Sequence, residues 1–182
     1  MQRNVSGKKV LFTTQQLVVL ALLVALQVVL GNLTQVPLIG KQFNFGFLPV
    51  AVAGAMLGIP GGLIVGALGD FIGAHLFPAG AYFPGFTLTS ALVGVLYAIP
   101  LYQKKPTVLR VVIAVALASV VNLFLNSLWL SMMYGSKTYW GWLVSRAGTY
   151  LVEGPAQAVV MFLCLQGLGR LKLPHGVRVG KE

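Results

Sequence analysis

The chain alternates long apolar runs with short connections rich in polar residues, glycine and proline. A membrane-spanning helix needs about 20 mostly apolar residues, and fewer where neighbouring helices shield it. By this measure the pattern predicts six spans, at roughly 14–31, 45–58, 61–76, 86–102, 108–133 and 141–169. The second and third spans are short and are separated by the GIPGG turn at 58–62, whose proline and glycines favour a sharp turn. We expect these two spans to form a hairpin that is tilted or partly buried.

The composition agrees with a membrane location. Hydrophobic residues make up 57% of the chain and charged residues 9%, whereas soluble domains carry about a quarter charged residues. We therefore expect an all-α membrane protein in which residues 1–182 form a single transmembrane domain in the bacterial plasma membrane. The first apolar run is too long for a signal peptide and should remain as the first span. The single cysteine, Cys164, excludes a framework of internal disulfides.

The basic residues predict the orientation of the chain. Six spans place both termini on one side of the membrane, together with the turn at 59–60 and the connection at 103–110. The basic residues of that side are Arg3, Lys8, Lys9, Lys104, Lys105, Arg110, Arg170, Lys172, Arg178 and Lys181, whereas the other side has Lys41 and Lys137. The positive-inside rule puts the first group, and both termini, in the cytoplasm. Because the basic residues lie at span ends rather than in one patch with stacking aromatics, the formal charge of +10 does not predict nucleic acid as a partner.

Three connections then face outwards, and one of them is rich in rings. The outer connections are 31–44, the stretch FPAGAYFPGFTLT (77–89) and 134–142. In the second, Pro78 and Pro84 restrict the backbone while Gly80 and Gly85 permit reversals. Its rings, Phe77, Tyr82, Phe83 and Phe86, bury well with little loss of entropy. We expect a preshaped lid over a cavity; the alternative is a plug that seals the bundle.

Asp70, Arg146 and Glu153 are the charged candidates for the membrane interior, where a charge costs several kcal/mol. Arg146 lies about five residues into its span, roughly 7 Å below the outer end, and fits either a carboxylate in an outward cavity or headgroups reached by snorkelling. Glu153 lies about two turns deeper on the same face. We expect it to form a buried network with the asparagines of the fifth span. Asp70 is interpreted as a structural acceptor for nearby hydroxyl or amide donors.

The fifth span carries polar residues on one helical face, because Asn122, Asn126 and Trp129 are spaced by four and three. Helix-to-helix hydrogen bonding explains Asn122. Asn126 and Trp129 lie high enough to line a cavity and orient a polar ligand, although an interfacial aromatic belt is an alternative for the tryptophan.

Small residues indicate close helix packing. The third span carries Gly62, Gly66, Gly69 and Gly73, for which we expect internal packing. Ala21 and Ala25, four apart in the first span, fit internal packing and docking to another membrane subunit equally well. The glycine series and the ring-rich connection have no counterpart after residue 108, which disfavours a carrier built from inverted repeats.

The chain lacks the motifs of an enzyme. The GK pairs at 7–8, 40–41 and 180–181 lack the glycine of a phosphate-binding loop, and no nucleophile elbow is present. His75 and His175 are isolated, so no metal or other cofactor is predicted. The sequence predicts no catalytic activity, and uphill transport would need an ATPase partner.

Several segments resemble the S components of energy-coupling factor transporters, the vitamin-binding membrane subunits, and specifically their folate branch. These are ALLVAL (21–26), NFGFLPVAVAG (44–54), GALGDFIGAHLFPAGAYFPGFTLTSALVGVLY (66–97) and NSLWL (126–130). The resemblance implies a six-helix bundle that binds a vitamin tightly from outside beneath its first and third external loops. It also implies docking, through the face of Ala21 and Ala25, to a transmembrane coupling subunit that works with two cytoplasmic ATPase subunits.

One departure leaves the vitamin open. Folate-binding relatives commonly have an arginine after the first helix and another before the Phe-Gly-Phe motif, whereas here Asn32 and Lys41 or Gln42 stand at those places. Losing these forked donors should weaken binding of the glutamate tail of folate, so pantothenate competes with folate, and cobalamin is a third option. The candidate substrate-binding residues are Lys41, Phe45, Phe77, Tyr82, Phe83, Asn126, Trp129, Arg146 and Tyr150. A proton-coupled carrier that uses Asp70 and Glu153, and a purely structural membrane subunit, remain as alternatives.

Overall fold

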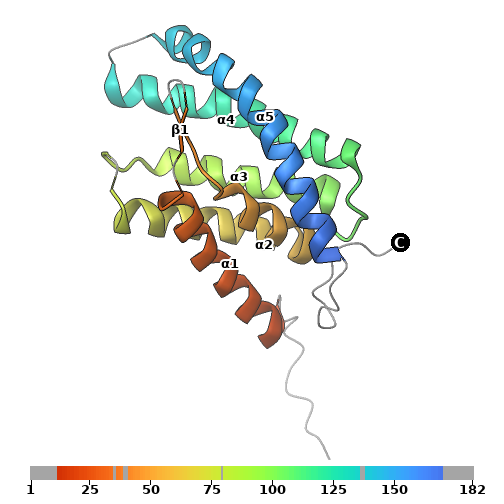
Figure 1. Ribbon diagram of the computed structural model, residues 1–182. Coiled ribbons are helices and arrows are strands. Elements are labelled where there is room, and N and C mark those ends of the chain that lie inside the picture. Colours follow the sequence, from red (N-terminus) through yellow and green to blue (C-terminus); the bar gives the residue numbers. More distant parts are fainter. Residues whose placement is uncertain (1–11, 35, 39–40, 79, 136–137, 170–182) are drawn as a thin grey trace, which may run out of the picture.

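The computed structural model describes residues 12–34, 36–38, 41–78, 80–135 and 138–169, with the backbone alone for 36–38 and 41–43. Within these residues the chain forms five helices and one short antiparallel hairpin (Figure 1). The elements are α1 (Thr14–Asn32), β1 (Val36–Leu38), β2 (Lys41–Phe43), α2 (Phe47–Leu76), α3 (Pro84–Leu101), α4 (Val108–Tyr134) and α5 (Tyr139–Gly169). All five helices are long and apolar enough to cross a membrane.

The helices agree with the predicted all-α membrane protein, but the predicted number of six spans is not confirmed. The second and third predicted spans both fall within α2, which is divided at Gly58. This residue has φ 75° and ψ −161°, a left-handed backbone conformation that glycine adopts without steric cost. The helix resumes so quickly because Pro60 lies within the first turn after the break, where its missing N–H is not needed. The sidedness of the two termini stays a prediction.

The chain reverses direction at this break. A Cβ atom built on Gly62 would lie 3.3 Å from the Cα atom of Gly54, although residues with this separation lie about 12 Å apart along a straight helix. The two halves of α2 therefore fold back on each other next to Gly58, at the place where the sequence predicts a turn.

The glycines of the second half of α2 pack inside the bundle, as predicted. A Cβ atom on Gly62 or Gly66 would lie 2.3 or 2.4 Å from the backbone carbonyl oxygen of Gly94 or Ser90 on α3. Gly69 and Gly73 instead leave room for the side chains of Gln27 and Asn32 on α1. Residues without side chains let backbones approach closely where lipid supplies no hydrophobic driving force. The first pair thus joins α2 to α3, and the second joins α2 to α1.

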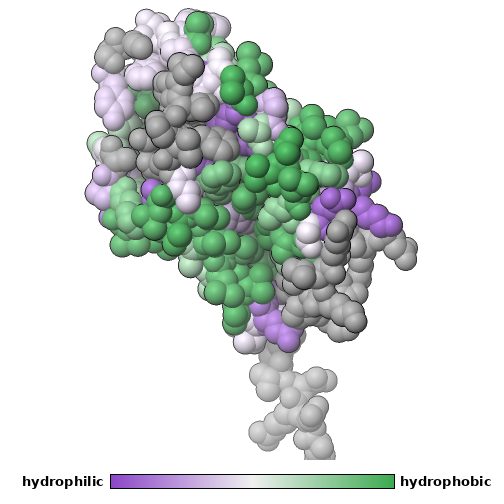
Figure 2. Space-filling model, viewed as in Figure 1, coloured by the Kyte–Doolittle hydropathy of each residue, from purple (hydrophilic) through white to green (hydrophobic). Residues whose placement is uncertain are grey.

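α2 is the central element of the bundle. In its most apolar stretch 72% of the residues are buried, against 17% in α5, which borders the bundle. α2 packs against α1 and α3, α4 packs against α3 and α5, and α5 returns to contact α2 (Figure 1). The outer surface is broadly hydrophobic on the face seen in Figure 2, with hydrophilic residues toward its margins. A lipid-facing exterior of this kind leaves polar chemistry to the interior.

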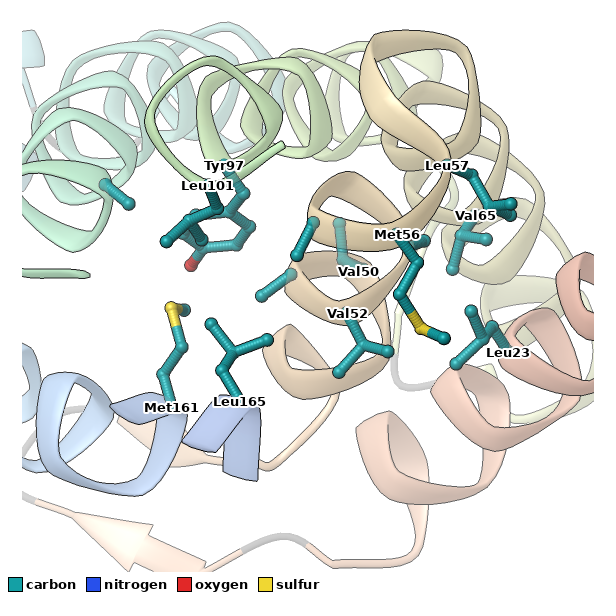
Figure 3. Close-up of a cluster of buried hydrophobic side chains, with 14 of the residues drawn as sticks. Leu23, Val50, Val52, Met56, Leu57, Val65, Tyr97, Leu101, Met161 and Leu165 are labelled. Atoms are coloured by element: carbon teal, nitrogen blue, oxygen red, sulfur yellow. The ribbon is translucent and has the colours of Figure 1, made fainter. Parts of the chain in front are cut away.

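The hydrophobic core joins α3, α5 and both halves of α2. Tyr97 and Leu101 of α3 face Met161 and Leu165 of α5, beside Val50 of α2 (Figure 3). All are buried, and Tyr97 is only 2% exposed. Tyr97 and Val50 also border the cavity described next, so the core forms part of its wall.

Candidate ligand-binding cavity

A cavity of about 420 Å³ lies among all five helices. This volume is within the range of small-molecule sites. Polar and aromatic residues make up most of its wall, among them Gln27 and Asn32 of α1; Phe47 and Asp70 of α2; Ser90 and Tyr97 of α3; Ser119, Asn122 and Asn126 of α4; and Tyr150, Glu153 and Gln157 of α5. An otherwise apolar bundle therefore contains a polar compartment of the size of a small organic molecule.

The ring-rich connection between α2 and α3 covers part of this cavity. Phe77, Tyr82 and Phe83 line it together with Phe86 at the start of α3. The ring of Phe83 is further held by Phe86, at 6.3 Å between centroids, and by Trp129 of α4, at 5.5 Å. Because space remains beneath these rings, the connection fits the predicted lid better than a plug.

Asp70 anchors this connection to α2. Thr87 Oγ1 donates a hydrogen bond of 2.8 Å to Asp70 Oδ2, and the Tyr82 hydroxyl lies 3.0 Å from the same Thr87 oxygen. Since the threonine proton is directed to the carboxylate, the tyrosine hydroxyl is the donor of the second bond. The Tyr82 ring also packs edge-on against Phe71, at 5.8 Å between centroids. Asp70 therefore accepts from a hydroxyl donor, as predicted, and this donor belongs to the network that holds Tyr82.

The amides of α4 form a short hydrogen-bonded series beside the cavity. Asn122 Nδ2 donates to the backbone oxygen of Ala118 (3.0 Å), so Asn122 Oδ1 faces the other way and accepts from Asn126 Nδ2 (3.1 Å). This sequence of bonds fixes the orientation of Asn126 and leaves its Oδ1 buried without a hydrogen-bond partner among the described residues. Gln27 Oε1 on α1 is in the same situation. Both oxygens belong to residues that line the cavity.

The α5 side of the wall contains a buried carboxylate. Glu153 is 5% exposed and accepts a 2.9 Å hydrogen bond from Gln157 Nε2, one turn further along the helix. Tyr150, one turn earlier, is 9% exposed and lines the same wall. Asn122 and Asn126 face the same cavity, whereas their predicted network with Glu153 stays a prediction. Among the described lining residues, the charged ones are Asp70 and Glu153, and none is lysine or arginine.

The structure brings five of the nine candidate substrate-binding residues together. Those that line the cavity are Phe77, Tyr82, Phe83, Asn126 and Tyr150. Phe45 lies just outside, with its ring 6.4 Å from that of Phe47. Arg146 places its guanidinium carbon 6.0 Å from the centre of the Tyr150 ring. The side chain of Lys41, in β2, is outside the described part of the structure.

Trp129 lies behind the wall rather than in it. Its indole Nε1 donates a 2.9 Å hydrogen bond to Thr89 Oγ1 on α3. Its ring fills the space beside Gly85, where an added Cβ atom would come within 2.5 Å of the indole. The contacts of Trp129 therefore join α4 to the start of α3 and support the ring of Phe83.

Sequence reasoning did not single out several lining residues, among them Gln27, Ser119 and Gln157. Gln157 follows Glu153 by four positions and so shares its helical face. Gln27 is a polar residue inside the apolar run of α1. In both cases an isolated polar residue in a spanning helix was the available signal. Among the described residues, no group of three or more His, Cys, Asp or Glu side chains is placed to hold a metal ion.

The sequence of this chain matches a known protein family. Residues 15–165 match the family model described as the ECF transporter, substrate-specific component. The chain belongs to this family. The substrate-specific components bind the transported compound and are not enzymes, and they are multi-pass proteins of the cell membrane. The predictions of the family, the membrane location and the absence of catalysis are confirmed.

Individual relatives of this substrate-specific component carry folate in their names. The chain is 36% identical over 164 residues to the folate transporter FolT of Clostridium novyi, covering 88% of this chain and 94% of that protein. It is 32% identical over 161 residues to FolT of Leuconostoc mesenteroides, covering 84% and 85%. A solved structure, the crystal structure of FolT bound with folic acid, matches with a TM-score of 0.74 and 32% identity over 82% of this chain and 92% of that one.

We expect the Thr87→Val variant to loosen the connection over the cavity. It leaves the Asp70 carboxylate without the hydroxyl donor and removes the acceptor of the Tyr82 hydroxyl, a loss of about 1.5–3 kcal/mol for a hydrogen bond to a charged group. Hydrogen exchange followed by mass spectrometry should show the amides of residues 80–83 exchanging at least about tenfold faster. Thr87→Ser keeps the hydroxyl and should exchange as the unsubstituted protein does. Equal exchange in all three proteins would contradict the anchoring role.

Proposed function

We propose that this chain captures folate from outside the cell for import by an energy-coupling factor transporter. The observation that carries the proposal is a cavity of about 420 Å³ whose wall combines aromatic rings with buried hydrogen-bonding groups. The folate names of the relatives at 36% and 32% identity, and of the solved structure at 32%, support the same vitamin.

The chemistry of the wall favours folate over pantothenate. Folate has a planar pterin ring and a benzoyl ring, which suit the aromatic residues Phe47, Phe77, Phe83, Tyr97 and Tyr150 that line the cavity. Pantothenate has no ring. Its carboxylate would also meet no lysine or arginine among the described lining residues, but the carboxylates of Asp70 and Glu153. Folate can place its own carboxylates at the mouth and its ring system inside.

Titration of the purified chain tests this function directly. We expect calorimetry in detergent to give a dissociation constant for folate below about 1 μM, and affinities for pantothenate and cobalamin at least about 100-fold weaker. Tighter binding of pantothenate than of folate, or the absence of folate binding, would contradict the proposal. In sealed vesicles the chain alone should bind folate without accumulating it. Accumulation driven by a proton gradient would instead support a carrier that uses Asp70 and Glu153.

Arg146 is proposed to bind the glutamate tail of folate at the mouth of the cavity. Its guanidinium lies over the ring of the cavity-lining Tyr150, and it precedes that residue by one helical turn. Because a charge-assisted pair in a partly dry site is worth about 1.5–3 kcal/mol, Arg146→Ala should weaken folate binding at least about tenfold.

Pteroate, which lacks the glutamate, provides the comparison for this variant. Arg146→Ala should leave pteroate affinity nearly unchanged, so that folate and pteroate bind more alike. Arg110→Ala is the control, because Arg110 lies at the start of α4 and donates to the backbone oxygen of Lys105. If Arg146→Ala binds folate as tightly as the control does, Arg146 belongs to the headgroup region instead.

The proposed partners are a transmembrane coupling subunit and two cytoplasmic ATPase subunits, with both termini of this chain in the cytoplasm. α1 supports this arrangement, because Ala21 and Ala25 are exposed among large exposed apolar residues such as Leu22. Small residues at such a site let a partner helix approach closely.

We expect Ala25→Trp to abolish copurification of the coupling subunit from cells that express all subunits, while folate binding is retained. Ala116→Trp, at an exposed alanine on α4, is the matched control and should assemble normally. Normal assembly of Ala25→Trp would exclude this face as the docking site.

A further inference from the structure

The connection between α3 and α4, residues 102–107, lies at the end of the bundle opposite the cover of the cavity. α3 begins at Pro84, directly after the covering connection, and ends at Leu101. Its 18 residues span about 27 Å at the helical rise, close to the thickness of a hydrocarbon core. Figure 1 shows the two connections at opposite ends of α3. A ligand of the 102–107 connection is therefore separate from a ligand of the cavity.

This connection and the helix that follows it carry three positive charges. Lys104 and Lys105 are exposed, and Arg110 lies in the first turn of α4. In the described part of the chain the acidic residues are Asp70 and Glu153, and both line the cavity instead. The potentials of neighbouring cations add, and lysine and arginine both form charge-assisted hydrogen bonds with phosphate groups. The connection thus favours an anion that carries phosphate oxygens.

Hydrogen bonds fix the backbone that carries these charges. Arg110 Nη1 donates to the backbone oxygen of Lys105 at 3.0 Å, so its guanidinium folds back onto the connection. The backbone N–H of Gln103 donates to the backbone oxygen of Ala55 on α2 at 3.1 Å. Gln103 has φ 51°, a left-handed conformation that is uncommon outside glycine. Because the fold already orders this backbone, less entropy is lost when a ligand binds to it.

Exposed apolar residues lie beside the basic ones. Ile99 in the last turn of α3 is 54% exposed, and Leu109 in the first turn of α4 is 67% exposed. Tyr102, between the two helices, is also exposed, as is typical of tyrosines at a membrane interface. Inorganic phosphate would contact only the basic residues. A phospholipid would bring its phosphate to them and its acyl chains to the apolar residues.

We propose that the connection at 102–107, through Lys104, Lys105 and Arg110, binds the phosphate group of an anionic phospholipid whose acyl chains contact Ile99 and Leu109. The proposed orientation puts this connection at the cytoplasmic leaflet, whose anionic lipids attract basic residues next to a spanning helix. The proposal goes beyond the orientation of the chain, because it assigns one connection as a site that distinguishes an anionic headgroup from a neutral one. It does not depend on folate being the ligand of the cavity.

Native mass spectrometry of the full chain in detergent, titrated with phosphatidylglycerol or phosphatidylcholine, tests this site. The two lipids share the phosphate and can carry identical acyl chains, but only phosphatidylglycerol has a net negative charge. We expect the unsubstituted chain to bind its first phosphatidylglycerol at least about tenfold more tightly than its first phosphatidylcholine. In the double variant Lys104→Gln, Lys105→Gln the two affinities should come within about threefold of each other, through weaker binding of phosphatidylglycerol.

Two double variants serve as controls. Lys104→Arg with Lys105→Arg keeps both charges and should keep the preference for phosphatidylglycerol. Lys8→Gln with Lys9→Gln removes the same charge from another part of the chain and should keep it too. An equal loss of preference in the Lys8, Lys9 variant would assign the effect to net charge and overturn the proposal. An unchanged preference in the Lys104→Gln, Lys105→Gln variant would overturn it as well.

Further arms separate the source of the phosphate and the state of the fold. Excess inorganic phosphate, compared with chloride at equal ionic strength, should not displace the lipid; displacement would assign the site to a free anion and contradict the proposal. Folate affinity should be the same with and without the two lysines, since the cavity cover lies at the other end of α3. If the chain binds no folate, circular dichroism reports the fold instead, and the lipid titration still decides. Equal affinities of the unsubstituted chain for both lipids overturn the proposal without any variant.

Discussion

A carboxylate inside a lipid-embedded bundle must be supplied with hydrogen-bond donors, and this requirement explains the arrangement of the cavity. Asp70 receives its donor from Thr87, at the start of α3. Glu153 receives one from Gln157 on its own helix. The amides of α4 bond to each other and to the backbone, and Asn126 Oδ1 is buried without a partner among the described residues. Both carboxylates of the cavity wall are thus held by hydrogen bonds from the protein itself.

The close helix contacts are what make such a cavity compatible with so short a chain. Gly58 turns α2 back on itself, and Gly62 and Gly94 bring the backbones of α2 and α3 into contact. These contacts concentrate the buried apolar area in and around α2, against the core of Tyr97, Met161 and Leu165. α4 and α5 contribute the remaining polar residues of the cavity wall.

Much of this arrangement could be predicted from the sequence, because hydrophobic run length and isolated polar residues are strong signals in membrane proteins. The helical segments, the turn near residue 58, the packing role of Gly62 and Gly66 and the acceptor role of Asp70 agree with the structure. The count of six spans is not confirmed, because the second and third predicted spans lie in one helix, α2, within which the chain reverses at Gly58. The length of an apolar run does not show whether two spans are separate helices or one helix that reverses at a single residue.

The cavity wall was only partly predictable for a different reason. Which face of a helix borders a cavity depends on the distance between neighbouring helices. The periodicity of apolar residues does not predict this distance. Trp129 and Asn126 share a face of α4, yet only Asn126 lines the cavity, because Trp129 fills the space beside Gly85. Gln27 lines the wall because Gly69 leaves room for it. In both cases a large side chain packs against a glycine of another helix, and such contacts can be identified only in the folded structure.

We propose that the polar space inside this bundle holds a pterin-containing vitamin. Native mass spectrometry of the chain, released from detergent directly after purification from cells supplied with several vitamins, tests it without any assumption about residues. We expect a bound species with the mass of a folate, at one per chain, which added folate increases and added pantothenate does not displace. A bound species with the mass of pantothenate or cobalamin, or a chain that stays empty in the presence of folate, would contradict it.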